Sequence, residues 1–383
     1  MRILFWTGYR FETYNGNTKS GLGGTETAIM EIAEGLTRYG HEVVVAGELD
    51  SSNGEKIRGV RWCSISEFEA DFSQVPSNYF DAVVGVNYMH YLRYCRDVGL
   101  DPEYKIFWLH NTEFHPWYKS EELETIDQDL YATDMIVTPS QWASNNVLDT
   151  IVNPLGERTG KQWSGLIIGA PNGIDPSKFK IKTQKDPNKF IWSSAVDRGL
   201  DRLLDNWHKI RSIMPSATLD VYYPKYSCPH GSGKESWKNI NGIEDKLAEL
   251  ADQGVNDMGS VSKDELYAAM ARATYWMYLT QYEETYCITA QEMQMSDVLC
   301  ITSNQAALEQ VVQEGIILPT DDYETMFDSV VQLLPRVDSG LKRKALKAAK
   351  ARTKLFTWDN AVAGWHHLLT ENIKDSKIIK HEN

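Results

Sequence analysis

Long apolar runs, paired cysteines and excess positive charge are absent from this sequence of 383 residues. No apolar run approaches the roughly 18 residues that a membrane-spanning helix needs, so we expect no such helix. The five cysteines are odd in number and scattered, without C-x-x-C spacing, which argues against a disulfide framework or a zinc site. A net charge of −14 disfavours nucleic acid as a partner. Since no N-x-S/T sequon occurs either, the sequence predicts a globular protein of the cytoplasm.

Apolar strands and amphipathic helices alternate along both halves of the chain. Ile3–Thr7 predicts a first buried strand and is too short for a signal peptide, and the spacing in Thr25–Tyr39 predicts a helix that Gly40 ends. Further strands are predicted at residues 42–46, 82–86, 105–109, 135–138, 166–169, 189–194, 218–223, 255–259, 274–279 and 298–302. Such alternation predicts an α/β fold with parallel sheets covered by helices on both faces.

A turn at Pro171–Asp175, followed by a polar stretch, marks a junction between two doubly wound domains. We expect an N-terminal Rossmann-like domain over residues 1–176, a second over 177–355, and a C-terminal helix with a tail over 356–383. Two such domains in tandem bind ligands in the cleft between them. We expect the last helix to cross back onto the first domain, and local packing is the alternative.

A glycine-rich loop, Gly21-Leu-Gly-Gly-Thr-Glu26, leads into the first predicted helix. Glycines allow a ligand to approach the backbone, and a helix N-terminus attracts anions. The dinucleotide fingerprint needs a third glycine where Glu26 stands, which disfavours a nicotinamide-dependent oxidoreductase. A tight connection without a ligand is the alternative.

Glu284 and Glu292 lie at and beyond a loop-to-helix junction that follows the strand predicted at 274–279. At about 1.5 Å per residue they are on the order of 10 Å apart, so that they could hold hydroxyls at both ends of an elongated ligand. An acidic helix turn and a solvated glutamate are the alternative. Between the two carboxylates, the backbone of the predicted helix start could hold a phosphate, and its residues are Thr285, Tyr286, Cys287 and Ile288.

Arg198 precedes Gly199 in the loop after the strand predicted at 189–194. An arginine at a strand-to-helix loop suits bidentate binding of a diphosphate. A surface arginine paired with Asp197 is the alternative.

Taken in order, several segments resemble the retaining, nucleotide-sugar-dependent glycosyltransferases of family 4, which have the GT-B fold. The resemblance implies two Rossmann-like domains that face each other across a cleft. It covers nearly the whole chain, and the Glu-x7-Glu pair is its most specific part. The matching segments are MRILF, GLGGTETAIMEIAEGLTRYGHEVVV, FWLHN, MIVTPSQWASNNV, GAPNGID, SSAVDRGLDRLL, EETYCITAQEMQMSDVLCITSNQAALEQVV and FTWDNAVAGWHHLL.

The resemblance implies a role for each matching residue. Glu284 matches a glutamate near the donor sugar hydroxyls, Glu292 one on the nucleotide ribose, and Arg198 a cationic residue on the diphosphate. The loop that closes over the donor and the histidine near the reacting sugar are matched by Gly23, Gly24 and His110. Glu284 and His110 are therefore the candidate catalytic residues.

Two departures from the family pattern fall in the predicted donor site. The family commonly has Glu-Gly-Phe-Gly where this chain has Glu284-Thr-Tyr-Cys, a change that leaves the backbone amides. The Gly-Arg that usually opens the diphosphate loop is replaced around Ser193, and Lys19 or Lys225 is a candidate to supply the second positive charge.

The resemblance implies transfer of a hexose from a UDP- or GDP-sugar to a glycan or lipid-linked acceptor, with retention and without metal or cofactor. Arg198 and helix-start amides can stabilise the charge on the departing phosphate. The aromatic-rich loops Tyr9–Ser20 and Glu113–Tyr118 suit a glycan acceptor. A non-catalytic protein that binds nucleotide sugars or carbohydrates on the same fold is the alternative.

For three other features we expect structural or solvent-exposed roles and no ligand. Asp127-Gln-Asp129 matches the metal-binding D-x-D pattern of the other glycosyltransferase fold, but it lies in a helical run and not after a strand, so we expect no metal. The basic helix at 341–355 predicts a solvated face with Ala and Leu on its other side, and weak peripheral contact with anionic lipid is the alternative. Surface or core positions without a metal are expected for His115, His208, His366 and His367.

Overall fold

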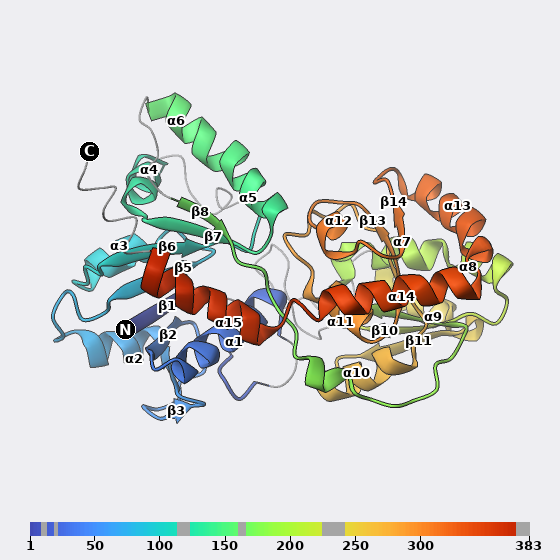
Figure 1. Ribbon diagram of the computed structural model, residues 1–383, viewed down its shortest axis with the longest axis horizontal. Helices are drawn as coiled ribbons and strands as arrows, with labels where there is room; N and C mark the ends of the chain where they lie inside the picture. Colours follow the sequence, from blue (N-terminus) through green and yellow to red (C-terminus); the bar gives the residue numbers. More distant parts are fainter. Residues whose placement is uncertain (9–13, 19–21, 113–122, 160–165, 224–241, 373–383) are drawn as a thin grey trace. The chain divides into compact units, whose positions relative to one another are not determined.

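The computed structural model describes residues 1–8, 14–18, 22–112, 123–159, 166–223 and 242–372. The chain divides into two α/β units (Figure 1). The first consists of Met1–Thr18, Gly23–Gly173 and Trp358–Asn383, and the second of Lys19–Leu22 and Ile174–Thr357. Each unit is built around a parallel sheet, and the predicted fold class is confirmed.

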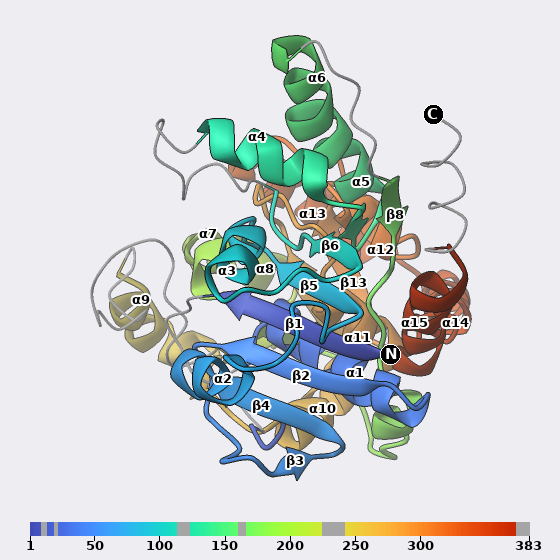
Figure 2. The same cartoon turned by 90° about the vertical axis from the view of Figure 1, so that its left-hand side faces the viewer.

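The first unit contains an eight-stranded sheet in the order β3-β4-β2-β1-β5-β6-β7-β8 (Figure 2). Within the described residues its neighbouring strands pair in parallel, except β3 with β4, which are antiparallel. The strands are β1 (Arg2–Gly8), β2 (Glu42–Gly47), β3 (Lys56–Ile57), β4 (Val60–Ser64), β5 (Ala82–Val86), β6 (Tyr104–Trp108), β7 (Met135–Thr138) and β8 (Leu166–Gly169). The helices are α1 (Gly24–Arg38), α2 (Ile65–Phe72), α3 (Tyr91–Asp97), α4 (Leu123–Ala132), α5 (Gln141–Val147), α6 (Asn153–Thr159) and α15 (Trp358–His367), with π-helical turns at Leu148–Val152 and Leu368–Asn372.

Helix α1 ends where the sequence predicts. Gly40 has a φ of 82°, which a glycine adopts without strain. The Gly40 amide donates to the Thr37 carbonyl and the His41 amide to the Leu36 carbonyl, at 3.0 and 3.3 Å. These two bonds form the Schellman motif that closes a helix before a strand.

The C-terminal helix α15 packs on α1 within the first unit, as Figures 1 and 2 both show. Gly35 makes this approach possible, because a Cβ at that position would lie 2.1 Å from a methyl carbon of Val362. Trp365 enters the core, with its ring 6.1 Å from that of Phe5 and 4.8 Å from that of Trp108. The helix therefore returns to the first unit, and the alternative of local packing on the second is wrong.

The second unit contains a six-stranded parallel sheet in the order β11-β10-β9-β12-β13-β14. From β9 the chain proceeds outward to β10 and β11, and it then returns to the other side of β9 with β12. The strand order thus reverses between β9 and β12. The strands are β9 (Lys189–Ser193), β10 (Thr218–Tyr222), β11 (Val255–Gly259), β12 (Tyr275–Tyr278), β13 (Leu299–Ser303) and β14 (Ile316–Leu318). The helices are α7 (Leu200–Asp205), α8 (Trp207–Ile213), α9 (Ile243–Glu249), α10 (Lys263–Arg272), α11 (Ile288–Met295), α12 (Leu308–Val311), α13 (Tyr323–Leu333) and α14 (Ser339–Thr353).

Two predicted helices of the second unit differ from the observed ones. The sequence pattern over residues 200–214 predicts one helix, but the structure has two, because Asn206, with φ and ψ of −101° and 7°, ends α7 before α8 begins. The helix expected from Tyr286 begins at Ile288, because Cys287 takes a left-handed conformation that an α-helix excludes.

Candidate active site

Two loops of the second unit meet at the carboxyl ends of β9 and β12. Gly199, in the loop after β9, has a φ of 104°, and a Cβ there would lie 3.0 Å from the Leu279 carbonyl oxygen of the loop after β12. Both its conformation and this approach therefore require glycine. In open parallel sheets ligands bind at the carboxyl ends of the strands where the strand order reverses, and β9 and β12 are that place.

Arg198 lies half-buried at this edge. Its guanidinium is 2.6 Å from the Asp197 carboxylate, and its Cζ lies 3.3 Å from the centre of the Tyr282 ring. Burial disfavours the positive charge, but the nearby Tyr282 and Asp197 outweigh it and raise the pKa of Arg198. The pairing with Asp197, expected as an alternative to a ligand role, is present, and the cation also stacks on an aromatic ring from the neighbouring loop.

Glu284 belongs to the same loop as Tyr282, the ring on which Arg198 stacks, and lies two residues after it. Burial raises the pKa of Glu284, against the opposing effects of the Tyr278 hydroxyl and the Arg198 charge. The Tyr278 hydroxyl donates to Glu284 Oε1 at 2.6 Å, and the Ser194 hydroxyl lies 3.3 Å from the Tyr278 oxygen. Among the described residues Oε2 has no hydrogen-bond partner, so one carboxylate oxygen is held and the other is available to a ligand.

Cys287 precedes α11 with a φ of 76°, unusual for a residue with a side chain. It occupies the position where the resembled family commonly has glycine. Burial raises the pKa of the Cys287 thiol, and Glu284 and Glu292 both contribute to the rise. The protonated thiol therefore lies near both carboxylates and is no nucleophile at neutral pH.

The four residues predicted to bind a phosphate at the start of a helix are divided between a loop and α11. Ile288 alone of the four residues belongs to α11, whose first turn leaves amides without intrahelical partners. Thr285 and Tyr286 belong to the preceding loop, and the Gln291 side-chain amide donates to the Tyr286 hydroxyl at 2.6 Å.

Glu292 is buried on α11, with 3% of its surface exposed, so the alternative of a solvated glutamate is wrong. The Lys263 ammonium and the Tyr267 hydroxyl, both on α10, donate to its Oε1 at 2.9 and 3.1 Å. Its Oε2 is buried and has no hydrogen-bond partner among the described residues. Such a buried oxygen ordinarily has a partner, so this one is a candidate to accept a hydrogen bond from a ligand.

Tyrosine and lysine side chains that the sequence pattern does not predict also contact this site. Tyr278 at the end of β12 carries the one available signal, since polar residues at the carboxyl ends of parallel strands commonly line ligand sites. Tyr282, Lys263 and Tyr267 reach the site through tertiary packing, which spacing along the chain does not reveal.

The other predicted site residues belong to the first unit. Gly23 is the N-cap of α1 with an extended backbone, and Gly24 begins the helix. A Cβ on Gly23 would lie 2.5 Å from a carboxylate oxygen of Glu26, which occupies the first turn. His110 follows β6 and is buried, with its amide donating to the Asn87 side-chain oxygen at 2.7 Å.

Some predicted residues lie outside the described part of the chain. These are Lys19, Lys225, His115, the loop Glu113–Tyr118 and most of Tyr9–Ser20.

Asp129 of the D-x-D match points to a structural role. It is buried on α4, and the Arg96 guanidinium lies 2.7 Å from its carboxylate. Across the described ranges, no group of three or more His, Cys, Asp or Glu side chains could hold a metal ion. No described helix is both long and apolar enough to cross a bilayer.

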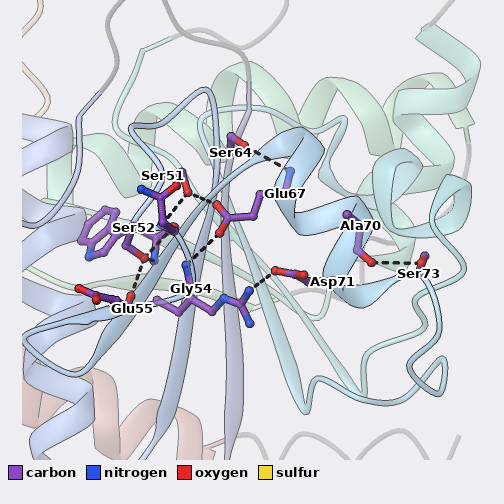
Figure 3. A network of polar contacts seen from close by, with 12 residues as sticks. Ser51, Ser52, Gly54, Glu55, Ser64, Glu67, Ala70, Asp71 and Ser73 are labelled. Carbon is purple, nitrogen blue, oxygen red and sulfur yellow. Dashed lines mark hydrogen bonds and ion pairs between the residues drawn. The ribbon is translucent and has the colours of Figure 1, made fainter.

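An open cavity lies at the carboxyl ends of β2 and β4 in the first unit. Its volume is about 550 Å³, and it is lined by Gly47, Glu48, Leu49, Ser64, Ile65, Ser66 and Glu69, so that apolar side chains share the lining with two serines and two glutamates. Beside it, Figure 3 shows the Glu67 carboxylate accepting hydrogen bonds from the Ser51 hydroxyl and the Gly54 amide. These bonds fix the loop after β2 to α2, next to the cavity.

No family model and no curated protein matches this sequence. Among solved structures, sucrose-phosphate synthase from Thermosynechococcus elongatus is similar, with 15% identity, coverage of 98% of this chain and 99% of that chain, and a TM-score of 0.74. Trehalose 6-phosphate synthase from Burkholderia multivorans has 11% identity, coverage of 99% and 98%, and a TM-score of 0.70. The Anabaena protein HepE in complex with UDP-glucose has 13% identity, coverage of 98% and 100%, and a TM-score of 0.66. At these identities the likeness establishes the fold, and the chain has the GT-B fold of two parallel-sheet units.

Proposed function

We propose that this protein is a glycosyltransferase that moves a hexose from a UDP- or GDP-sugar to a glycan or lipid-linked acceptor. The supporting observation is that the loops of Arg198 and Glu284, far apart in sequence, meet where the strand order reverses. Arg198 stacks on the Tyr282 ring, and the Tyr278 hydroxyl that donates to Glu284 lies 3.3 Å from the Ser194 hydroxyl of the loop after β9. HepE, a protein of the same fold, has been solved in complex with UDP-glucose. The family 4 resemblance adds retention of configuration to the proposal.

Each donor-site residue has a proposed task. Arg198 and the amides at Cys287 and Ile288 bind the diphosphate and stabilise the charge that develops as it departs. The buried Oε2 of Glu292 accepts a hydrogen bond from a ribose hydroxyl. The free Oε2 of Glu284 accepts from a hydroxyl of the sugar, while Tyr278 holds its other oxygen.

The remaining residues act around the donor. The loop backbone at Thr285 and Tyr286 completes the phosphate site, and the loop at Gly23 and Gly24 closes over the donor. His110 orients a sugar hydroxyl. Because a guanidinium and helix-start amides supply the positive charge, we propose that no metal is needed and that activity survives EDTA.

We further propose that the acceptor sugar binds on the first unit in the cavity at the carboxyl ends of β2 and β4. Its two serines and two glutamates, Ser64, Ser66, Glu48 and Glu69, are hydrogen-bonding partners for sugar hydroxyls. We propose the cytoplasm as the location, where nucleotide sugars and reduced cysteines coexist, and residues 1–176, 177–355 and 356–383 as the functional divisions.

Turnover of the donor tests the proposal. Thermal shift first selects the best ligand from a panel of UDP- and GDP-sugars, because a ligand that binds the folded state raises its stability. With that donor, Arg198→Ala is expected to lower kcat by about 100-fold, the typical loss of one charge-stabilising group, and Arg198→Lys by less, because the positive charge remains. Arg202→Ala is the matched control, since Arg202 lies four residues on in α7 and pairs with Asp201. Equal rates for the two Arg198 variants would argue against a diphosphate contact.

The Asp197–Arg198 ion pair supports one competing function. The Arg198 guanidinium lies 2.6 Å from the Asp197 carboxylate, so binding a phosphate would weaken that ion pair. A protein that binds nucleotide sugars without turnover is therefore the second candidate. This candidate would be favoured if the protein bound a donor but neither hydrolysed it nor transferred its sugar to any glycan or lipid-linked acceptor tested.

A further inference from the structure

Helix α14 and the two residues that follow it combine positive charge with exposed leucines. We call this surface the basic–leucine face, and it comprises Leu341, Arg343, Lys344, Lys347, Lys354 and Leu355, all exposed to solvent. At about 100° per residue the four that lie within the helix fall in an arc of about 160°, with Leu341 at one edge of the arc beside the three cations. Lys354 is the C-cap of α14, and Leu355 follows it. Figure 1 shows α14 in orange-red within the second unit.

The other basic residues of α14 face the protein and are already engaged. The Lys342 ammonium lies 4.2 Å from the centre of the Tyr275 ring, and Lys350 forms an ion pair with Asp297. Arg352 donates to the Val311 and Gln310 carbonyls, the first at 2.7 Å. The solvated basic face that the sequence predicts at 341–355 therefore holds only part of the positive charge, because three of the cations lie on the inward side.

The two leucines are unusually exposed. Leu341 and Leu355 keep 60% and 67% of their surface in contact with solvent, while Tyr39, the next large apolar side chain among the described residues, keeps 46%. Their place beside the cations also corrects the expectation of leucine on the opposite side of the helix. Large apolar side chains at this exposure favour an apolar partner.

We propose that the basic–leucine face binds the surface of an anionic phospholipid membrane. These four cations, which form no ion pair within the described part of the chain, make a local site for phosphate headgroups on a protein with a net charge of −14. The adjacent leucines can enter the boundary between headgroups and acyl chains, while the long lysine and arginine stems keep their charges in water. This inference goes beyond the proposed function and does not depend on it.

Sedimentation of the full chain with vesicles, without donor or acceptor, tests the proposal. Binding is expected to vesicles that contain phosphatidylglycerol and to be absent with phosphatidylcholine alone. Raising the salt from about 0.05 to about 0.5 M is expected to weaken binding. At the higher salt the screening length becomes shorter than the distances between the cations and the lipid phosphates. Lys344→Gln with Lys347→Gln is expected to lower the partition coefficient about 25-fold, since each charge contributes about five-fold.

The matched control is Lys180→Gln with Lys182→Gln, which removes the same charge from exposed residues of the same unit and is expected to change binding less than about two-fold. Gln and Lys have similar helix propensities, so α14 is expected to stay folded, as circular dichroism can verify.

Leu341→Ser with Leu355→Ser is expected to weaken binding at both salt concentrations. Equal effects of the two lysine pairs, equal binding to neutral vesicles, or binding to poly-glutamate but to no vesicle would each overturn the proposal. The last result would indicate an acidic protein partner.

Discussion

Acidification is expected to destabilise the first unit through one buried imidazole. His41 precedes β2 with 7% of its surface exposed, and its Nε2 lies 2.9 Å from Nδ1 of His366 on α15. Burial, the charge of the chain N-terminus and His366 lower the pKa of His41 to about 4, against a smaller opposing effect of Asp81. The His366 ring also stacks on Tyr39 at 4.4 Å, so the histidine pair connects α15 to the end of α1.

The magnitude follows from proton linkage. In the unfolded chain a histidine titrates near about 6.5, so protons favour the unfolded state below that pH. The stability contributed by neutral His41 is complete above about pH 6.5 and falls as the pH falls toward 4. At pH 5 the loss attributable to this one side chain is about 2 kcal/mol, and it approaches about 3 kcal/mol below pH 4.

Native-state hydrogen exchange of peptides from β1, β2 and α15 reads the stability of this unit alone. His41→Gln removes the titration but keeps groups that can hydrogen-bond to His366. Between pH 7.5 and about pH 5, the wild type is expected to lose about 2 kcal/mol more than His41→Gln. His208→Gln, at an exposed position on α8, is the control and is expected to behave as the wild type. Equal losses in the wild type and His41→Gln would refute the reasoning.

Three further predictions concern backbone conformation, helix packing and donor binding. Cys287→Gly is expected to be more stable than Cys287→Ala by about 1 kcal/mol in urea unfolding, because glycine adopts positive φ without strain. A more stable Cys287→Ala would contradict backbone strain at this position. Gly35→Ala is expected to destabilise by about 1–3 kcal/mol in the same assay through its clash with Val362, whereas Gly364→Ala, with open space at its Cβ, is expected to stabilise by up to about 1 kcal/mol. Val362→Ala should restore part of the stability in the Gly35→Ala background, because it removes the two closest carbons and leaves only the Cβ, at 2.9 Å, and no recovery would place the strain elsewhere. Glu292→Ala is expected to weaken donor binding by about 1–3 kcal/mol in calorimetry, and unchanged affinity would remove its ribose role.

Strand positions could be predicted well because a short, continuous apolar run is compatible with few structures other than a buried strand. Ala82–Val86 and Met135–Thr138 are buried along their whole lengths, so the edges of each run coincide with the edges of the strand. The short strands β3 and β4 were missed. Val60–Ser64 includes Arg61 and leads directly into α2, and so lacks both a clean alternation and a turn signal.

The candidate site could be predicted in outline but not in its contacts. The loops that carry Arg198 and Glu284 follow adjacent strands, which the alternation of strands and helices makes foreseeable. The left-handed Cys287 was not foreseeable, because residue type alone argues against that conformation. Helix α11 buries Gln291 and Glu292, although a polar helix ordinarily indicates a solvated face.

A crystal structure with the nucleotide sugar that gives the largest thermal shift tests the central claim most directly. We predict diphosphate oxygens within hydrogen-bond distance of the Arg198 guanidinium and the Ile288 amide, a ribose hydroxyl on Glu292 and a sugar hydroxyl on Glu284. A nucleotide sugar bound away from the carboxyl ends of β9 and β12, or one that leaves Arg198 on Asp197 and Oε2 of Glu292 without a partner, would contradict the account.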